Sequence, residues 1–431
     1  MTDLLSKLRS LDRHGRSQER NLAERPVKVA HLTTVDSSLR YLLRPQLRAV
    51  RDRGGESIGI SAPGPYADEL AAEGIRHVPL GSSTRGMNLL ADVRAAAELW
   101  RILRRERPDV LHTHNPKPGI YGRIVGRLAG VPIVVNTCHG LWATENDRLL
   151  KRWVVLALEA VAARFSHAEL IQNVEDLELL TRRRINVPSR TKLLGNGVDL
   201  DRFAPGTIDP KDRLAVRDEL GAGPDTIVVG IVGRMVAEKG YPELFEAAAR
   251  LDGRYVVAAI GPDDPAKPDA LTAAQRDAAV RAGVVFLGQR DDVERLYAAM
   301  DVFVLPSHRE GFPRAAMEAA ATGLPIVATD VRGCRQVVVD GVTGLLVPVR
   351  DPERLAAAIS SLGEDPALRC RMGVAAARRA RESFDERRVV DLVLSTYQEV
   401  ATRRGLDVSL PARPESASAR AAQPAQLEAP A

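Results

Sequence analysis

The chain has 431 residues, of which 45% are hydrophobic and 27% charged, a composition that excludes a disordered or fibrous protein. A single hydrophobic core rarely serves more than about 300 residues, so the length predicts two domains. The 61 basic and 56 acidic residues leave a net charge of +5. This charge suits an anionic ligand or an acidic membrane surface and gives no reason to expect nucleic acid as a partner. Cys138, Cys334 and Cys370 are too far apart in sequence for a disulfide framework or a zinc motif, so we expect a cytoplasmic protein.

The first residues predict a flexible leader. Residues 1–25 contain neither the apolar core nor the small-residue cleavage site of a signal peptide. Four leucines at helical spacing leave open a short helix on a bilayer, but a solvated leader is the simpler interpretation. The most apolar later run, Trp153–Ala163, is interrupted by Glu159 and is too short to span a membrane.

Short β-branched runs alternate with longer amphipathic segments, and this alternation predicts parallel sheets that helices cover on both faces. In the first half the expected strands are Val27–Leu32, Glu56–Ser61, Val110–Thr113, Ile133–Thr137, Leu170–Gln172 and Lys192–Leu194. In the second half they are Ile227–Val232, Tyr255–Ile260, Val284–Leu287, Val302–Leu305, Pro325–Thr329 and Gly344–Val347. The expected helices are Leu89–Arg104, Lys151–Phe165, Pro242–Leu251, Asp292–Met300, Pro313–Ala321, Ala356–Arg379 and Glu382–Ala401.

The strand–helix pattern runs twice, so the sequence predicts an α/β protein with two doubly wound, Rossmann-like domains and a cleft between them. A Pro-, Gly- and Asp-rich interval at 203–224 is interpreted as the interdomain linker. The expected parts are a leader at 1–25, an N-terminal domain at 26–205 completed by a C-terminal helix at 382–405, a C-terminal domain at 206–381, and a disordered tail at 406–431. Open parallel sheets bind ligands outside the carboxyl ends of their strands, so polar residues directly after strands are the candidate site.

One motif follows the strand Ile227–Val232 and carries two cations between glycines. It reads Gly233-Arg234-Met235-Val236-Ala237-Glu238-Lys239-Gly240. A guanidinium binds phosphate oxygens in pairs and an ammonium adds a compact positive charge, so Arg234 and Lys239 suit a diphosphate. The alternative is a solvated connector in which Arg234 pairs with Glu238.

A second motif follows the strand Val302–Leu305. It reads Pro306-Ser307-His308-Arg309-Glu310-Gly311-Phe312-Pro313-Arg314-Ala315-Ala316-Met317-Glu318. Pro313 fits the first position of a helix, and the free backbone N–H groups of a helix start suit a phosphate or sugar oxygen. Gly311 lets the backbone approach a ligand closely.

Two carboxylates belong to this second motif. Glu310 lies in the loop before the helix, and Glu318 lies more than one turn into it among Ala and Met residues. A carboxylate in apolar surroundings needs a partner, and ribose hydroxyls would supply hydrogen-bond donors. The alternative for Glu318 is an i,i+4 ion pair with Arg314, worth about 0.2–0.5 kcal/mol.

Histidines occur at the ends of two strands of the first half. His139 follows Ile133–Thr137 and precedes Gly140, which places it at the expected cleft; a packing role is the alternative. His112 and His114 lie on one face of a strand, but no carboxylate or third histidine lies at ligand spacing, so no metal site is predicted. Neither a strand–GxGxxG–helix unit nor a P-loop occurs, which argues against those nucleotide-binding classes.

Together these motifs resemble those of retaining glycosyltransferase family 4 (glycosyltransferase group 1), whose members have a two-domain B-type fold. The resemblance covers Val27 to Ala401. Its most specific elements are Asn196-Gly197-Val198-Asp199 with Phe203 and Pro205, the Gly-Arg…Glu-Lys-Gly loop, the Glu310–Glu318 pair, and Asp340-Gly341-Val342-Thr343-Gly344-Leu345-Leu346-Val347.

The resemblance implies a role for each matching position. Arg234 and Lys239 correspond to the cations that hold the donor diphosphate, and Glu318 corresponds to the carboxylate on the nucleotide ribose. Glu310 corresponds to the loop that contacts the donor sugar and phosphate, and His139 to a histidine near the reacting centre. The candidate catalytic residues are therefore Arg234, Lys239, His139 and Glu310, and the candidate donor-binding residues are Gly233, Gly311, Phe312, Pro313, Arg314 and Glu318. The N-terminal domain would take the acceptor and the C-terminal domain the nucleotide-sugar.

The activity that the resemblance implies is retaining transfer of a hexose-type sugar from a nucleotide-sugar, by expectation a UDP-sugar. The acceptor would be a saccharide or a lipid-linked molecule in bacterial cell-surface polysaccharide or glycolipid synthesis. No cofactor and no metal are expected, because fixed cations and helix N–H groups can stabilise a departing diphosphate. Peripheral contact with an anionic membrane at its inner face is a further expectation. Two alternatives stay open: a nucleotide-sugar epimerase of the same architecture and a catalytically silent nucleotide-binding subunit.

Overall fold

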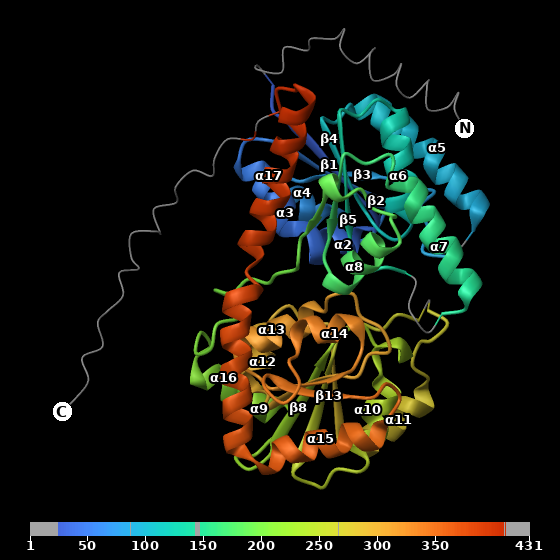
Figure 1. Cartoon of the computed structure of the whole chain (residues 1–431). Helices are drawn as coiled ribbons and strands as arrows, with labels where there is room; N and C mark the ends of the chain where they lie inside the picture. Colours follow the sequence, from blue (N-terminus) through green and yellow to red (C-terminus); the bar gives the residue numbers. More distant parts are fainter. Residues whose placement is uncertain (1–24, 87, 143–146, 266, 409, 411–431) are drawn as a thin grey trace, which may run out of the picture. The chain divides into compact units, whose positions relative to one another are not determined.

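The computed structural model in Figure 1 describes residues 25–86, 88–142, 147–265, 267–408 and 410. Nearly all of the predicted leader and most of the predicted tail lie outside these residues. The two doubly wound sheets that the sequence predicts are confirmed.

Seven strands form the first sheet, in the order β3-β2-β1-β4-β5-β6-β7. The strands are β1 (Lys28–Val35), β2 (Glu56–Ala62), β3 (Arg76–Pro79), β4 (Val110–His114), β5 (Ile133–Cys138), β6 (Ala168–Ile171) and β7 (Thr191–Leu193). The helices and helical turns among them are α2 (Asp36–Ser38), η3 (Leu39–Leu43), α3 (Arg44–Asp52), α4 (Ala67–Ala72), α5 (Leu89–Glu106), α6 (Lys117–Leu128), α7 (Leu149–Ala162), α8 (Val174–Arg182) and η4 (Pro188–Arg190). The pairs β1–β2, β2–β3, β1–β4 and β6–β7 are parallel, as apolar strands joined by helices predict.

Six strands form the second sheet, in the order β10-β9-β8-β11-β12-β13, and every neighbouring pair is parallel. The strands are β8 (Ile227–Val232), β9 (Tyr255–Ile260), β10 (Val284–Gly288), β11 (Val302–Leu305), β12 (Ile326–Thr329) and β13 (Gly344–Val347). The helices are α9 (Pro210–Glu219), η5 (Ala237–Lys239), α10 (Tyr241–Ala248), α11 (Ala273–Arg281), α12 (Val293–Ala299), α13 (Arg314–Thr322), α14 (Arg332–Val337), α15 (Pro352–Glu364), α16 (Pro366–Ser383) and α17 (Glu386–Arg404).

Alternate residues of the second sheet face two separate hydrophobic cores. Val228 and Phe303 belong to one core, together with residues of α12 and α13. Val229 and Val302 belong to the other, together with residues of α10 and α15. Figure 1 shows α12 and α10 on the two sides of this sheet. Because side chains alternate along a strand, both faces of the sheet are covered, which is why its strands are apolar throughout.

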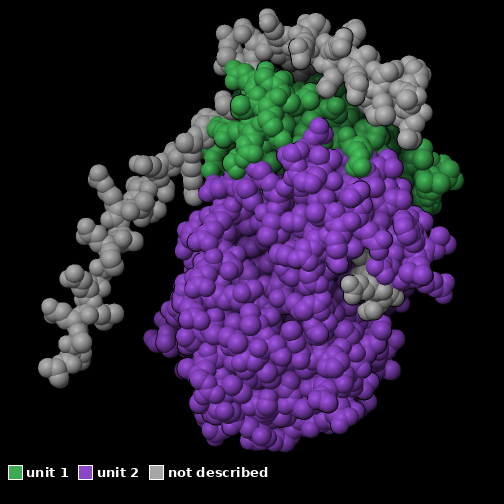
Figure 2. Space-filling view, in the orientation of Figure 1, with its two compact units in different colours: residues 1–136, 164–168, 393–431 green, residues 137–163, 169–392 purple. Residues whose placement is uncertain are grey.

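The chain divides into two compact units, which Figure 2 colours separately. Unit 1 consists of residues 1–136, 164–168 and 393–431, and unit 2 of residues 137–163 and 169–392. The whole second sheet and every candidate site residue belong to unit 2.

The interval 203–224, interpreted above as a linker, contains the helix α9. Asp209 caps this helix by accepting a hydrogen bond from the backbone N–H of Lys211 at 2.8 Å. Arg217 of α9 is buried and pairs with Asp301 at 3.0 Å. The segment is therefore a packed part of unit 2, and its polar composition reflects capping and a buried ion pair.

The predicted helix Ala356–Arg379 is two helices, α15 and α16. Asp365 accepts a hydrogen bond from the N–H of Leu368 at 2.8 Å and caps α16, whose first residue is Pro366. A proline lacks the N–H that a continuous helix needs at that position, so the Asp-Pro pair ends one helix and starts the next.

Candidate functional site

The two sequence motifs come together at one edge of the second sheet. Strands β8 and β11 are neighbours, and the strand order of the sheet reverses between them. Ligands of doubly wound sheets bind at such a switch point, outside the carboxyl ends of the strands. The loops that leave these two strands carry the motifs that begin at Gly233 and Pro306.

The two loops are in direct contact. The backbone N–H of His308 donates a hydrogen bond to the carbonyl oxygen of Glu238 at 2.9 Å. Gly240 has φ of 77°, and a Cβ atom at this position would lie 2.0 Å from the carbonyl oxygen of Pro306. The close approach therefore requires glycine, and it fixes the β8 loop against the β11 loop.

Lys239 and Glu310 join the two loops through their side chains. The Lys239 Nζ atom lies 2.6 Å from Glu310 Oε1, and Ser307 donates a second hydrogen bond to the same oxygen at 2.7 Å. The exposed fraction is 23% for the Lys239 side chain and 9% for that of Glu310. The ammonium group is thus held in one place, next to the loop that enters α13.

Arg234 lies on the same loop as Lys239 and retains more exposure. Its guanidinium pairs with Asp264 at 3.0 Å, and 41% of its side chain is exposed. Glu238 pairs instead with Arg309 at 2.9 Å, so the alternative Arg234–Glu238 pair is wrong. Arg234 therefore keeps guanidinium surface that a phosphate could bind.

The start of α13 differs by one residue from the sequence prediction. Pro313 is the N-cap residue, with φ of −74° and ψ of 113°, and Arg314 is the first helical residue. Pro313 cannot cap the helix with a side-chain oxygen, and α13 has no acidic residue in its first turn. A helix start of this kind carries partial positive charge and suits an anion.

Two asparagines hold the loop before α13, and sequence reasoning did not assign them this role. Asn173 donates a hydrogen bond to the carbonyl oxygen of Gly311 at 2.9 Å, and Asn196 donates one to that of Phe312 at 3.1 Å. Asn196 was identified only as part of the Asn196-Gly197-Val198-Asp199 motif. Neither contact has a sequence signal, because both partners are backbone oxygens far along the chain.

His139 reaches this loop through its backbone. A Cβ atom on Gly311 would lie 2.0 Å from the carbonyl oxygen of His139, and one on Gly140 would lie 2.8 Å from the Cα atom of Gly311. Both glycines are therefore needed for the contact. Burial lowers the pKa of the His139 ring to about 4, although a hydrogen bond with Gln172 opposes this shift. The ring is neutral near pH 7, so one of its nitrogen atoms can donate a hydrogen bond to a hydroxyl group and the other can accept one.

Glu318 has a partner that the sequence did not indicate. The hydroxyl of Tyr297 donates a hydrogen bond to Glu318 Oε2 at 3.0 Å. The i,i+4 contact with Arg314, which was the alternative to a ribose-binding role, exists as a looser ion pair at 3.7 Å. Arg314 also donates a hydrogen bond to the carbonyl oxygen of Gly197 at 3.2 Å. Burial, followed by the adjacent Glu318 charge, raises the pKa of Tyr297 well above its usual value, so the tyrosine stays a donor.

The arrangement suits a ligand with concentrated negative charge. Three cations of the site each have a carboxylate partner, in the pairs Lys239–Glu310, Arg234–Asp264 and Arg314–Glu318. These partners fix the cations before a ligand arrives, so binding costs little reorganisation. A phosphate group at the start of α13 would gain both the helix N–H groups and a fixed ammonium group. The chemistry that such a site supports best is departure of a phosphate leaving group.

Two doubly wound sheets, with a phosphate-suited site at the switch point of the second, are typical of the B-type class of glycosyltransferases. The chain belongs to the glycosyltransferase group 1 (family 4) proteins and is a glycosyltransferase. Residues 212–379 match the family described as "Glycosyl transferases group 1", and residues 13–197 match the "Glycosyl transferase 4-like domain".

Individual relatives agree with this assignment. The chain is 32% identical over 315 residues to the UDP-Gal:alpha-D-GlcNAc-diphosphoundecaprenol alpha-1,3-galactosyltransferase of Escherichia coli, covering 71% of this chain and 79% of that protein. It is 24% identical over 378 residues to the N,N'-diacetylbacillosaminyl-diphospho-undecaprenol alpha-1,3-N-acetylgalactosaminyltransferase of Campylobacter jejuni, covering 87% and 99%. HepE of Anabaena, solved in complex with UDP, has a similar fold, with a TM-score of 0.72 and 22% identity over 86% of this chain and all of HepE.

Proposed function

We propose that this glycosyltransferase moves a hexose-type sugar from a UDP-sugar to a lipid-linked saccharide, with retention of configuration, in bacterial cell-surface polysaccharide or glycolipid synthesis. The observation that carries the proposal is the Lys239–Glu310 contact, because it joins the two motif loops at the switch point of the second sheet. Support for the donor and acceptor comes from the Escherichia coli and Campylobacter jejuni relatives, whose names specify lipid-linked acceptors and, in the first case, UDP-galactose.

In the proposed reaction the donor diphosphate binds to Arg234, Lys239 and the N–H groups at the start of α13. Glu318 accepts hydrogen bonds from the ribose hydroxyls, and Glu310 and neutral His139 bind hydroxyls of the donor sugar. The bond between the anomeric carbon and the phosphate oxygen breaks, and negative charge develops on the diphosphate. Lys239 stabilises that charge.

The acceptor hydroxyl then bonds to the anomeric carbon on the face that the diphosphate leaves. Its proton passes to an oxygen of the leaving phosphate, so the products are the glycoside and UDP. This proposal requires no covalent enzyme intermediate and no catalytic metal. The fixed cations take the charge that a metal would otherwise neutralise.

The direct test is transfer from UDP-galactose to GlcNAc-diphosphoundecaprenol, with UDP-glucose and UDP-N-acetylgalactosamine as further donors. We expect one donor to give a glycosylated lipid whose new anomeric centre has the donor's configuration by NMR, at a rate that EDTA leaves unchanged. An inverted centre would refute retention, and loss of rate in EDTA would refute metal-independent transfer. Epimerisation of the donor without an acceptor, and no transfer, would establish the epimerase alternative; the matched glycosyl transferase families disfavour it.

We also propose that α7 docks on an anionic membrane. The core-facing residues of this helix include Val155 and Ala162, which are buried. Its outward face is apolar as well, with Leu150 77% exposed and Trp153 65% exposed. The exposed apolar residues of α7 are Leu149, Leu150, Trp153, Val154, Leu158 and Val161. A helix that exposes several large apolar side chains to solvent marks a docking surface.

Basic residues lie on α7 and on the segment that contacts Trp153, which favours anionic lipid as the occupant over a neutral partner. The guanidinium of Arg183 lies 5.9 Å from the ring centre of Trp153, and Arg182 and Arg184 flank it in sequence. Lys151 and Arg152 lie on α7 itself. Apolar side chains next to several cations are typical of helices that lie in the headgroup region. None of the helices among the described residues combines the length and apolarity that crossing a bilayer requires.

Co-sedimentation with vesicles tests the membrane proposal. The full chain should bind vesicles rich in phosphatidylglycerol and bind phosphatidylcholine vesicles several-fold less. Leu150→Glu and Trp153→Glu should each weaken binding at least tenfold. Leu214→Glu is the matched control, because Leu214 is an exposed leucine of α9, 56% exposed, outside this surface. Equal binding of all variants would reject α7 as the docking surface.

A further inference from the structure

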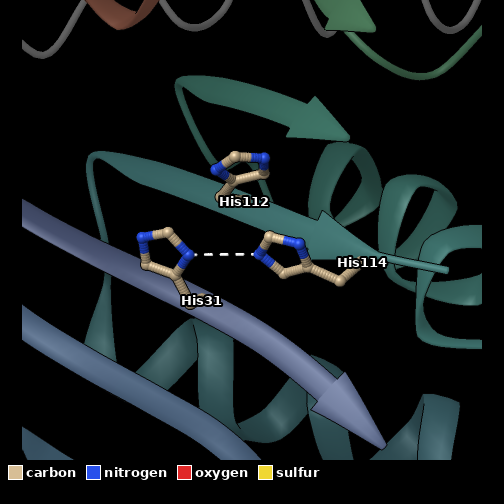
Figure 3. Close-up of side chains that lie close together, drawn as sticks. All are labelled: His31, His112 and His114. Carbon is tan, nitrogen blue, oxygen red and sulfur yellow. Dashed lines mark hydrogen bonds between the residues drawn. The ribbon is translucent and has the colours of Figure 1, made fainter. Parts of the chain in front are cut away.

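Three histidines of unit 1 form a buried cluster on one face of the first sheet. His31 lies on β1 directly opposite His112 on β4, and His114 lies two residues further along β4 on the same face. None of the three is more than 2% exposed. Figure 3 shows the three rings gathered together, with a nitrogen of His31 facing a nitrogen of His114.

The cluster occupies positions where aliphatic side chains are the norm. The alternate residues Leu32 and Leu111 of the same two strands belong to a hydrophobic core on the other face of the sheet. Burying three imidazoles costs free energy unless their nitrogen atoms find partners. The groups that bind the ring nitrogen atoms therefore indicate whether the cluster is a hydrogen-bond network or a metal site.

The nitrogen atoms are close enough to share one metal ion. His31 Nδ1 and His114 Nε2 are 3.1 Å apart, and one nitrogen from each of the three rings lies within 4.8 Å of the others. A tetrahedral zinc with bonds of about 2.1 Å holds its ligand nitrogens about 3.4 Å apart. The His31–His114 separation already fits this value, and small ring rotations can bring His112 to it.

Two further contacts favour a metal over a closed hydrogen-bond network. The Nδ1 atom of His112 is hydrogen-bonded to the hydroxyl of Tyr397 on α17 at 2.6 Å. A hydrogen bond at the second ring nitrogen orients a metal-ligating histidine and leaves its Nε2 atom for the metal. Within the described part of the chain, the buried Nε2 atom of His31 has no hydrogen-bond partner. Among the residues that the structure describes, the His31 ring hydrogen-bonds only to another imidazole, so one of its two nitrogen atoms has no partner.

We propose that His31, His112 and His114 bind a zinc ion that holds β1 and β4 together. The ligand atoms would be His31 Nδ1, His112 Nε2 and His114 Nε2, with water or hydroxide in the fourth position. Imidazole nitrogen is a common zinc ligand, and three histidines are a known ligand set. The site belongs to unit 1, whereas the residues of the proposed donor site belong to unit 2. We assign the zinc a structural role, because its ligands come from two paired strands.

Metal analysis of the full chain, purified from zinc-supplemented cells without a histidine tag, tests the proposal. We expect about one zinc per chain after dialysis, a raised Tm relative to chain from zinc-depleted cells, and a visible ligand-field band when cobalt replaces zinc. His114→Asn should carry less than a tenth of that zinc. His77→Asn should keep it, because His77 is a half-buried histidine of the same unit that hydrogen-bonds Ser61.

Tyr397→Phe provides a second variant that does not remove a ligand. Loss of the outer hydrogen bond should weaken zinc binding about 10–100-fold in competition with a chelator, with the far-UV spectrum unchanged. The proposal is overturned if the wild-type chain contains no zinc and shows the same Tm with and without it. It is also overturned if Tyr397→Phe binds zinc as tightly as the wild type.

Discussion

Lys239→Ala is the substitution whose effect the structure defines most sharply. If the ammonium group stabilises the departing diphosphate, its removal is comparable to loss of one fixed hydrogen-bond donor at a developing charge. That loss lowers kcat about 10²–10³-fold, or about 2.7–4 kcal/mol of transition-state stabilisation. The donor KM should change less, because the charge that Lys239 meets grows as the bond breaks.

The same substitution also affects stability, and the structure allows the two effects to be separated. Lys239 lies 2.6 Å from Glu310, whose side chain is only 9% exposed, so the single variant leaves a shielded carboxylate without its cation. This should lower the free energy of unfolding by about 1–3 kcal/mol. The double variant Lys239→Ala/Glu310→Gln removes the stranded charge, so its Tm should recover while its kcat stays low.

Arg309→Ala is the matched control for this experiment. The Arg309–Glu238 pair joins the same two loops at 2.9 Å but is 37% and 29% exposed, so it contributes little to stability. We expect kcat within threefold of the wild type. Rates should be measured as UDP release and lipid glycosylation at a temperature where every variant is folded. A Lys239→Ala enzyme with kcat within threefold of the wild type would refute the assigned role, as would recovery of kcat in the double variant.

Three further predictions concern other residues of the site. Glu318→Gln should raise the donor KM about tenfold and leave kcat within threefold of the wild type, since ribose contacts stabilise substrate and transition state alike. Unchanged donor affinity with a lowered Tm would instead indicate a purely structural role beside Tyr297. Gly311→Ala should lower the free energy of unfolding, measured by urea titration, by about 1–3 kcal/mol, because its Cβ atom would lie 2.0 Å from the carbonyl oxygen of His139. Gly253→Ala is the control: a Cβ atom there would have no atom within 4 Å, so the same quantity should change by less than about 0.5 kcal/mol. The pKa of His139 is about 4 in the folded chain and 6.5 in the unfolded chain. As the pH falls below 6.5 the unfolded chain therefore binds the proton first, and the free energy of unfolding decreases, by up to about 2 kcal/mol at pH 5. His139→Asn should lack that part of the pH dependence.

Strand positions could be predicted from sequence because the strands of the second sheet are largely apolar and most of their residues are buried. The ranges of β8, β9, β11 and β13 agree with the prediction, since continuous apolar runs bounded by turn residues leave little choice. The strand β3 was missed, because Arg76–Pro79 is an edge strand with an arginine, a histidine and a proline in four residues. Polar edge strands carry no periodic apolar signal.

The position of a candidate site residue was predictable where the residue directly follows a strand. Lys239 and Glu310 each lie in a loop after a strand, and the strand order makes those loops neighbours. Tyr297 and Asn173 were missed because their partners lie on other elements, and only the folded chain brings the atoms together. Side-chain contacts of this kind have no spacing rule in the sequence.

The histidine cluster illustrates the same limit. His112 and His114 were recognised as sharing one face of a strand, and the metal was rejected for want of a third ligand. A third histidine, His31, lies on a strand far earlier in the chain, and the parallel pairing of β1 with β4 places it opposite His112. Register between strands cannot be read from the spacing within one of them.

Hydrogen–deuterium exchange of the full chain with and without UDP tests the central claim most directly, because it reports where the diphosphate binds without requiring the acceptor. UDP should slow exchange in the peptides that cover 233–240 and 307–318, and Lys239→Ala should remove most of this protection. Binding of UDP with protection confined to other peptides would contradict the claim.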